Sequence, residues 1–201
     1  MGRLVRRATI AASLALAGGS ACSFLLDFDE CRDHADCAAP GGPPMACSED
    51  RRCVPADEIA CTSHQACSDA FGDDFLCTPA GACKSALTAE CTKIHWPSGD
   101  RDKAVFLGSI VPVSPPYDAI TVPLRNAIEL AVEDFNKTVS LPGGRRVAWV
   151  ECDDHGVLDR AQLAAEHLVD IVGAPALLGP IFSEQVLKIA KELAVPKDVF
   201  V

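Results

Sequence analysis

The sequence predicts an α/β protein in which a partial, doubly wound parallel sheet follows a disulfide-rich region with little regular secondary structure. Two observations predict this class. Over residues 103–201, short apolar runs rich in β-forming residues alternate with segments whose apolar residues recur at helical spacing. Over residues 31–91, cysteines recur at a fixed period and large apolar side chains are scarce. The two halves therefore need different physical explanations for how they fold.

The sequence of residues 103–201 predicts alternating strands and helices. Apolar residues at helical spacing, such as Ala127, Ile128 and Ala131, mark the first of three expected helices, and faces centred on Ala165 and Ala190 mark the others. Short connections between alternating elements favour parallel strands with helices on both faces of the sheet. The expected strands span residues 103–111, 146–152, 174–178 and 199–201.

Three strand-to-helix junctions are expected at the carboxyl edge of this sheet, where ligands of parallel sheets bind. We call them the first junction (residues 111–118), the second junction (153–159) and the third junction (179–184). Each ends at a helix amino terminus, whose free N–H groups and partial positive charge favour a carboxylate or phosphate. Asp153 and Asp154 are expected to be turn residues, because adjacent carboxylates at a strand end point apart.

The first half contains two copies of one 30-residue unit. Adding 30 to the first four cysteine positions gives the next four, and a ninth cysteine stands where a third copy would begin. The units have too few apolar residues for a core, so disulfides are expected to replace packing, each contributing on the order of 3 kcal/mol. The expected disulfide cysteines are Cys31, Cys37, Cys47, Cys53, Cys61, Cys67, Cys77 and Cys83.

The cysteine pairing itself stays open, because each copy allows three connectivities. Cys91 and Cys152 can bond to each other, or Cys152 can pair with a cysteine beyond Val201. Zinc is the alternative, since His34 and His64 each follow a cysteine by three residues. We favour disulfides because the protein reads as exported and the common zinc-finger spacing is missing, and we expect no metal. A solvated, stapled spacer is the preferred role for residues 31–91.

The first residues predict export. Arginines at positions 3, 6 and 7 precede an apolar run much shorter than the roughly 20 residues that span a membrane. The run ends in "GGSAC", which is similar to the lipobox of bacterial lipoproteins, and this similarity implies that Cys22 is lipidated. Gly19 and Ala21 also fit ordinary signal cleavage at the same bond.

The expected organisation is a signal peptide (1–21), an acidic tether (22–30), the cysteine-rich region (31–91), a linker (92–102) and the α/β region (103–201). The net charge of −10 argues against a nucleic-acid partner, which would need clustered Lys and Arg. An enzyme is the weakest interpretation, because no dinucleotide, phosphate-loop or nucleophile-elbow motif follows a predicted strand. No cofactor is expected.

Residues 103–201 resemble the leucine/isoleucine/valine-binding proteins, the periplasmic receptors of amino acid ABC transporters with the type I periplasmic-binding fold. The similarity rests on "FLGSIVPVSPPY", "LRNAIELAVEDFNK", "VAWVECDDHGVLDRAQLAAEHLVD" and "ALLGPIFSEQVLKIAKELAVP", taken in this order. It implies ligand contacts at Ser183, Tyr117, Ser114 and Gly179, with Ser183 either binding a carboxylate or only capping its helix. The Pro115–Pro116 pair departs from the glycine that is common in the family, which leaves the ligand type open.

The resemblance implies a lipid-anchored, extracytoplasmic and non-catalytic receptor that binds amino acids or similar small polar ligands. Its expected partners are that ligand, the membrane through the lipid anchor, and an ABC permease. The alternative is a surface lipoprotein that senses ligands or binds other proteins, with the cysteine-rich repeats as its interaction module. The chain stops inside an expected strand, so we expect a fragment or a truncated reading frame whose further ligand contacts would follow Val201.

Overall fold

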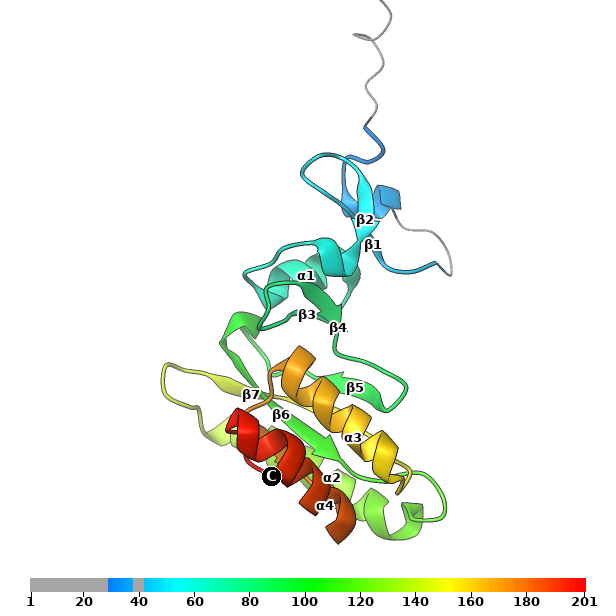
Figure 1. Ribbon diagram of the computed structural model, residues 1–201. Helices are drawn as coiled ribbons and strands as arrows, with labels where there is room; N and C mark the ends of the chain where they lie inside the picture. Colours follow the sequence, from blue (N-terminus) through cyan, green and yellow to red (C-terminus); the bar gives the residue numbers. More distant parts are fainter. Residues whose placement is uncertain (1–28, 38–41) are drawn as a thin grey trace, which may run out of the picture.

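The computed structural model describes residues 29–37 and 42–201. The predicted signal peptide and Cys22 lie outside the described residues, as does most of the expected acidic tether. The described chain forms a stack, with the two cysteine-rich units at one end and the α/β region at the other (Figure 1). Within the described residues, no helix combines the length and apolar character needed to cross a membrane.

The α/β region is built on a four-stranded sheet in the order β5-β7-β6-β8. Strands β6 (Ala104–Ile110), β7 (Arg146–Cys152) and β8 (Ala176–Leu178) are parallel, as the sequence predicted. Strand β5 (Cys91–His95) pairs antiparallel with β7 at the edge of the sheet. The expected fourth strand contributes a single parallel bridge between Ala176 and Phe200.

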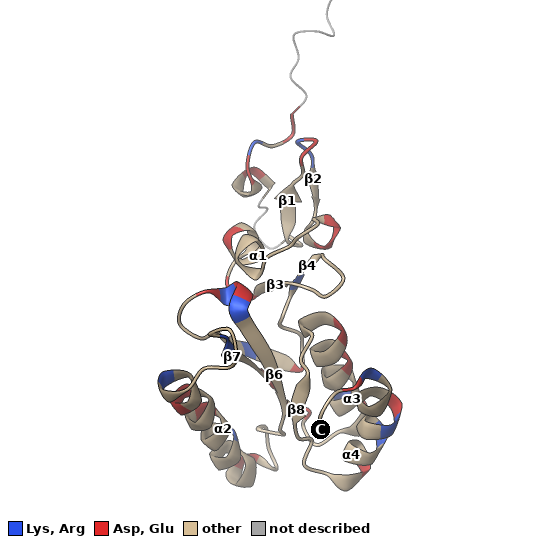
Figure 2. Cartoon of the chain, turned by 90° about the vertical axis from the view of Figure 1, so that its left-hand side faces the viewer, with Lys and Arg blue, Asp and Glu red and all other residues tan. Residues whose placement is uncertain are grey.

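Helices cover both faces of the sheet, which confirms the doubly wound class. Helix α2 (Asp118–Thr138) lies on one face, and α3 (Leu158–His167) and α4 (Ser183–Ile189) lie on the other (Figure 2). Helices α3 and α4 both continue as π-helical turns, over Leu168–Val172 and Ala190–Ala194. Short 3₁₀ turns, Arg101–Lys103 and Val195–Lys197, precede β6 and follow the last π turn.

Each cysteine-rich unit consists of a short helix and a hairpin of two three-residue strands. The first unit has a 3₁₀ turn (His34–Cys37), β1 (Met45–Cys47) and β2 (Cys53–Pro55). The second has α1 (His64–Phe71), β3 (Phe75–Cys77) and β4 (Cys83–Ser85), and a 3₁₀ turn (Ala56–Glu58) joins the units. Such short strands bury little apolar surface, so the disulfides are expected to supply most of the closure.

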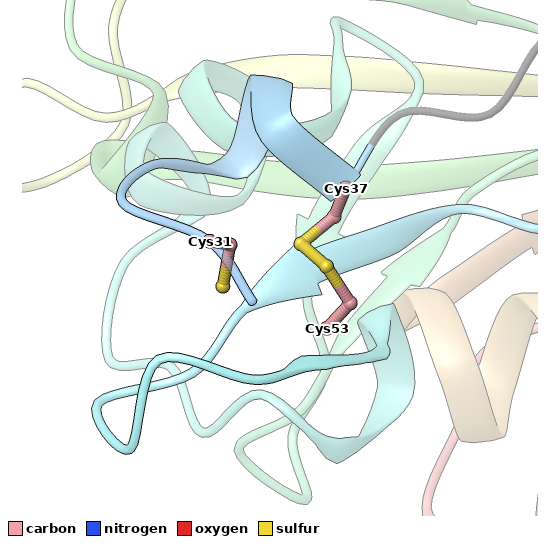
Figure 3. Close-up of side chains that lie close together, drawn as sticks. All are labelled: Cys31, Cys37 and Cys53. Carbon is pink, nitrogen blue, oxygen red and sulfur yellow. A yellow bond between two sulfur atoms is a disulfide. The ribbon is translucent and has the colours of Figure 1, made fainter. Parts of the chain in front are cut away.

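The cysteines of both units form disulfides with one connectivity, first to third and second to fourth. The bonds are Cys31–Cys47 and Cys37–Cys53 in the first unit, and Cys61–Cys77 and Cys67–Cys83 in the second. The two bonds of a unit lie side by side, so the sulfur atoms of Cys31, Cys37 and Cys53 fall within 4.8 Å of one another (Figure 3). Sulfur atoms this close together resemble the ligands of a metal site, but each of these three sulfurs belongs to a disulfide.

The two histidines considered as zinc ligands have a shared structural role instead. In the first unit, Nδ1 of His34 accepts a hydrogen bond from the backbone N–H of Cys47 at 3.1 Å. In the second, Nδ1 of His64 accepts one from Cys77 at 3.2 Å. The histidine therefore belongs to the repeat unit, in which it ties the start of the short helix to the hairpin.

The second unit is packed onto the amino end of the sheet. Asp102 accepts hydrogen bonds from the backbone N–H groups of His64 and Gln65 at the start of α1, and the His64 ring meets Phe106 edge-on at 5.1 Å. Arg101 pairs with Asp73 at 2.8 Å. A cavity of about 530 Å³, with both polar and apolar walls, lies between the second unit and the sheet. The second unit is thus part of the same folded body as the sheet.

Residues 92–102 differ from the linker that the sequence predicted. Their first part belongs to β5, and Cys91, the first residue of this strand, bonds to Cys152 in β7. Of the two alternatives for these cysteines, the structure therefore shows the mutual bond. The hydrophobic core is continuous across this boundary, since Leu76 and Ala86 of the second unit pack in one cluster with Ile110 and Leu168.

Candidate ligand-binding edge of the sheet

The three junctions leave the carboxyl ends of β6, β7 and β8, which are neighbours in the sheet. Side chains connect them in pairs. The Ser114 hydroxyl of the first junction donates to Asp153 in the second, and the Tyr117 ring meets Phe182 of the third junction at 5.1 Å. Gln185, just beyond the third junction, donates to Asp154 at 2.7 Å. The junctions therefore form one continuous edge.

Ser114 and Asp153 form the link between the first two junctions. Asp153 is buried, and its other carboxylate oxygen accepts the backbone N–H of His155 at 2.9 Å. The Ser114 hydroxyl proton is engaged by Asp153, so this side chain could meet a ligand only through its oxygen lone pairs. The predicted ligand contact of Ser114 stays a prediction, and the structure adds a positioning role.

Tyr117 lies at the amino end of α2, and its ring is held by two contacts. It packs against the Phe182 ring, and it fills the space above Gly156, where an added Cβ would collide with it. Among the described residues, the Tyr117 hydroxyl has no hydrogen-bond partner. A fixed ring with a free hydroxyl at the edge is compatible with the predicted ligand contact.

Ser183 is the first residue of α4, and Phe182 occupies the N-cap position. Its side chain is exposed, and α4 has no side-chain cap hydrogen bond. The alternative in which Ser183 only caps its helix therefore finds no support in the described residues. The ligand contact of Ser183 that the resemblance implies stays a prediction.

Gly179 has a structural reason to be glycine. Its φ is +94°, a backbone conformation that L side chains rarely adopt, and an added Cβ would collide with the carbonyl oxygen of Ile110. The close backbone approach that the sequence suggested is therefore made to β6, within the protein. A contact of Gly179 with ligand stays a prediction.

The buried pair Asp154–Gln185 was not predicted as a functional contact. The two residues are 0% and 2% exposed, and burial raises the pKa of Asp154. Within the described chain, one carboxylate oxygen of Asp154 and the amide oxygen of Gln185 have no hydrogen-bond partner. A weak signal for Gln185 is visible in the sequence, where this polar residue directly precedes an apolar helix face.

Comparison with known proteins supports the predicted resemblance. Residues 104–201 match the family described as periplasmic binding protein, which confirms the resemblance predicted for residues 103–201. The match covers the β6–α4 body and all three junctions. No curated protein sequence shows a significant similarity to this chain.

Several solved structures resemble the α/β region. A solute-binding protein of an ABC transporter from Rhodopseudomonas palustris, in complex with 3,4-dihydroxybenzoic acid, is 23% identical with a TM-score of 0.43, covering 48% of this chain and 26% of that one. The leucine-binding protein LivK of Thermotoga maritima is 26% identical with a TM-score of 0.42, covering 47% and 26%. LivJ of Streptococcus pneumoniae, bound to isoleucine, is 18% identical with a TM-score of 0.41, covering 48% and 32%. The chain thus spans about a quarter to a third of these proteins.

Proposed function

We propose that this protein is an extracytoplasmic solute-binding receptor for amino acids or similar small polar ligands, anchored through lipid on Cys22 and working with an ABC importer. The observation that carries the proposal is the convergence of the three junctions on one edge, within the segment that matches the periplasmic-binding family. The site holds a ligand and carries out no reaction.

The chemistry of the edge supports a ligand that carries a carboxylate. Ser183 is exposed at the start of α4, and Tyr117 presents a hydroxyl from a ring that already packs against Phe182. Donors that are positioned before binding lose little entropy when the ligand arrives, so few contacts can give useful affinity. Such an edge would form one wall of a site whose opposite wall comes from further chain or a partner.

The arrangement of the molecule fits an anchored receptor. The cysteine-rich units lie toward the amino end of the sheet, and the candidate edge is at the opposite end (Figure 1). A lipid on Cys22 would hold the protein from the side of the cysteine-rich units. The candidate edge would then point away from the membrane surface.

The proposal is tested on the complete receptor, which includes the further chain or partner that supplies the opposite wall, by titrating it with each of the common L-amino acids and following its thermal unfolding. A ligand at a hundredfold excess over its Kd stabilises the folded state by about 2.7 kcal/mol, which raises Tm measurably. Ser183→Ala should weaken binding of the positive amino acid about tenfold, since it removes one hydrogen bond to a charged group, while Tm without ligand stays unchanged.

Thr138→Ala provides a matched control, because it removes a hydroxyl from the last residue of α2, at the end of that helix far from the edge. There the Thr138 hydroxyl donates to the Asp134 carbonyl. Ligand affinity should not change in this variant. Equal affinity in the wild type and Ser183→Ala would remove Ser183 from the site. Flat melting curves for every amino acid would favour the alternative, a surface lipoprotein whose cysteine-rich units bind another protein.

A further inference from the structure

The turn that ends the cysteine-rich region reaches the candidate ligand-binding edge. Strand β5 runs antiparallel to β7, so its first residue, Cys91, pairs with the last residue of β7, Cys152. The second junction begins at the next residue, Asp153. Residues 88–90, which lead into β5, therefore arrive beside the second junction from outside the segment that matches the periplasmic-binding family.

The contacts between this turn and the second junction are both covalent and hydrogen-bonded. Cys91 and Cys152 form a disulfide, and both are buried, with 0% and 1% exposure. The residues next to this bond also pair: the backbone N–H of Asp153, which follows Cys152, donates to the carbonyl of Glu90, which precedes Cys91, at 2.7 Å. The Cys152 carbonyl in turn accepts the N–H of Val111, the first residue of the first junction, at 3.0 Å.

The turn is ordered by its own hydrogen bonds, so it can act as a fixed support. The Thr88 hydroxyl oxygen accepts the backbone N–H groups of Glu90 and Cys91 at 3.2 and 3.0 Å. The Thr88 N–H donates to the Cys91 carbonyl at 2.8 Å. A side chain that closes a turn on two amides in this way leaves the backbone few alternative conformations.

We propose that the turn of residues 88–91 is a positioning element of the candidate ligand-binding edge, which holds the second junction through the Cys91–Cys152 bond and the Glu90 carbonyl. Its effect passes through Asp153, which orients the Ser114 hydroxyl and the His155 N–H. The cysteine-rich region is then part of the binding lobe, in addition to any role as a spacer. The effect on ligand affinity rests on the function proposed above, whereas the effect on local order does not.

The test uses the full chain with Cys91 and Cys152 both replaced by Ala, so that no free thiol remains. Hydrogen–deuterium exchange at residues 153–157 should become at least about tenfold faster, while the paired residues of β6 and β7 keep their protection. The matched control replaces Cys61 and Cys77 by Ala, which removes a disulfide of the second unit far from the edge. Exchange at residues 153–157 should not change in this control.

A milder pair of variants covers the case in which loss of the disulfide prevents folding. Thr88→Val keeps the shape of the side chain but removes the acceptor of two amides, whereas Thr88→Ser keeps the acceptor. Exchange at residues 153–157 should rise in Thr88→Val and return to the wild-type rate in Thr88→Ser. Unchanged exchange in both the Cys91/Cys152 and the Thr88→Val variants would overturn the proposal.

Binding of the L-amino acid that stabilises the wild type adds a functional readout. Affinity should fall about tenfold in Thr88→Val and be restored in Thr88→Ser, because a binding site needs its contacts held within about 0.5 Å. Faster hydrogen–deuterium exchange at residues 153–157 without a change in amino acid affinity would refute the positioning role. If no amino acid binds the wild type, the proposed function fails, and the exchange data still decide whether the turn holds the second junction.

Discussion

Gly179 shows how one residue can be required by packing at a place where ligand contact was also predicted. Its φ of +94° alone disfavours any side chain, and the Ile110 carbonyl occupies the space that a Cβ would need. Gly99 has a similar φ of +101°, but an added Cβ there would meet open space. A side chain at Gly99 would therefore meet backbone strain alone, whereas a side chain at Gly179 would meet both strain and a steric collision.

We expect Gly99→Ala to reduce the free energy of unfolding by about 1 kcal/mol, from backbone strain alone. Gly179→Ala should cost about 2–4 kcal/mol, because the Ile110 backbone must also move. Urea unfolding of the two variants measures the difference. Equal losses would mean that the Ile110 contact is unimportant, and the glycine would then need another explanation, such as close approach to a ligand.

For single residues, the sequence indicates which of them lie at the strand ends better than it indicates which contacts they make. The positions of Ser114, Tyr117, Gly179 and Ser183 follow from strand ends, which periodicity reveals. Their hydrogen bonds depend on which junctions become neighbours, and that requires the sheet order. The Asp154–Gln185 pair was missed for the same reason, since the two residues are 31 positions apart in the chain.

Glu151 joins three secondary-structure elements through one carboxylate. Arg125 of α2 donates to both carboxylate oxygens at 2.9 and 2.7 Å, and His95 of β5 lies 3.2 Å away. Burial would raise the pKa of Glu151, but the hydrogen bonds from His95 and Arg125 outweigh it and lower the pKa to about 2. The hydrogen bonds with Glu151 in turn raise the pKa of Arg125.

This network predicts a loss of stability in acid. Because the folded pKa of Glu151 lies below its ordinary value of 4.5, the folded state binds this proton less readily than the unfolded state. The contribution is complete above pH 4.5 and is lost as the pH falls toward 2, on the order of 3 kcal/mol in all. Urea unfolding of the wild type and Glu151→Gln at pH 6, 4.5 and 3 measures it, and the decline should be much shallower in the variant.

Glu133→Gln is the matched control, at a glutamate on α2, the helix that carries Arg125. Glu133 pairs with Lys137 at 3.0 Å, but both side chains are more than half exposed, so solvent screens the pair. The unfolding free energy of Glu133→Gln should therefore depend on pH in the same way as that of the wild type. If Glu151→Gln declined with pH as steeply as Glu133→Gln does, the buried network could not be the source of the acid sensitivity.

At the scale of elements, the parallel strands and their helices were predictable, and β5 was not. Buried parallel strands are apolar on both faces and stand out from their surroundings. Strand β5 is at the edge of the sheet and contains polar Thr92 and Lys93, both exposed, so its composition reads as a linker. The one hint in the sequence was the open alternative of a bond between Cys91 and Cys152, which would tie the end of the cysteine-rich region to the α/β region.

For the whole molecule, the main difference from expectation is that the second cysteine-rich unit shares the core of the α/β region. Repeats with few apolar residues were expected to fold on disulfides alone. Leu76 departs from this rule: it is fully buried and packs in the cluster that contains Ile110 and Leu168. The corresponding residue of the first unit, 30 positions earlier, is the small Ala46. Among the described residues, Leu76 is thus a large side chain through which the second unit, but not the first, enters this core cluster.

Leu76→Ala should therefore weaken the α/β region although it changes the cysteine-rich region. Truncating a buried Leu costs about 2–5 kcal/mol, and because the core is shared, one cooperative transition should move to a lower Tm. Exchange should also become faster in β6 and β7. Leu187→Ala, at a site that is 70% exposed, should change stability by less than about 0.5 kcal/mol. Two separate transitions in Leu76→Ala, with the exchange of β6 and β7 unaltered, would mean that the second unit only rests on the sheet and contributes nothing to its stability.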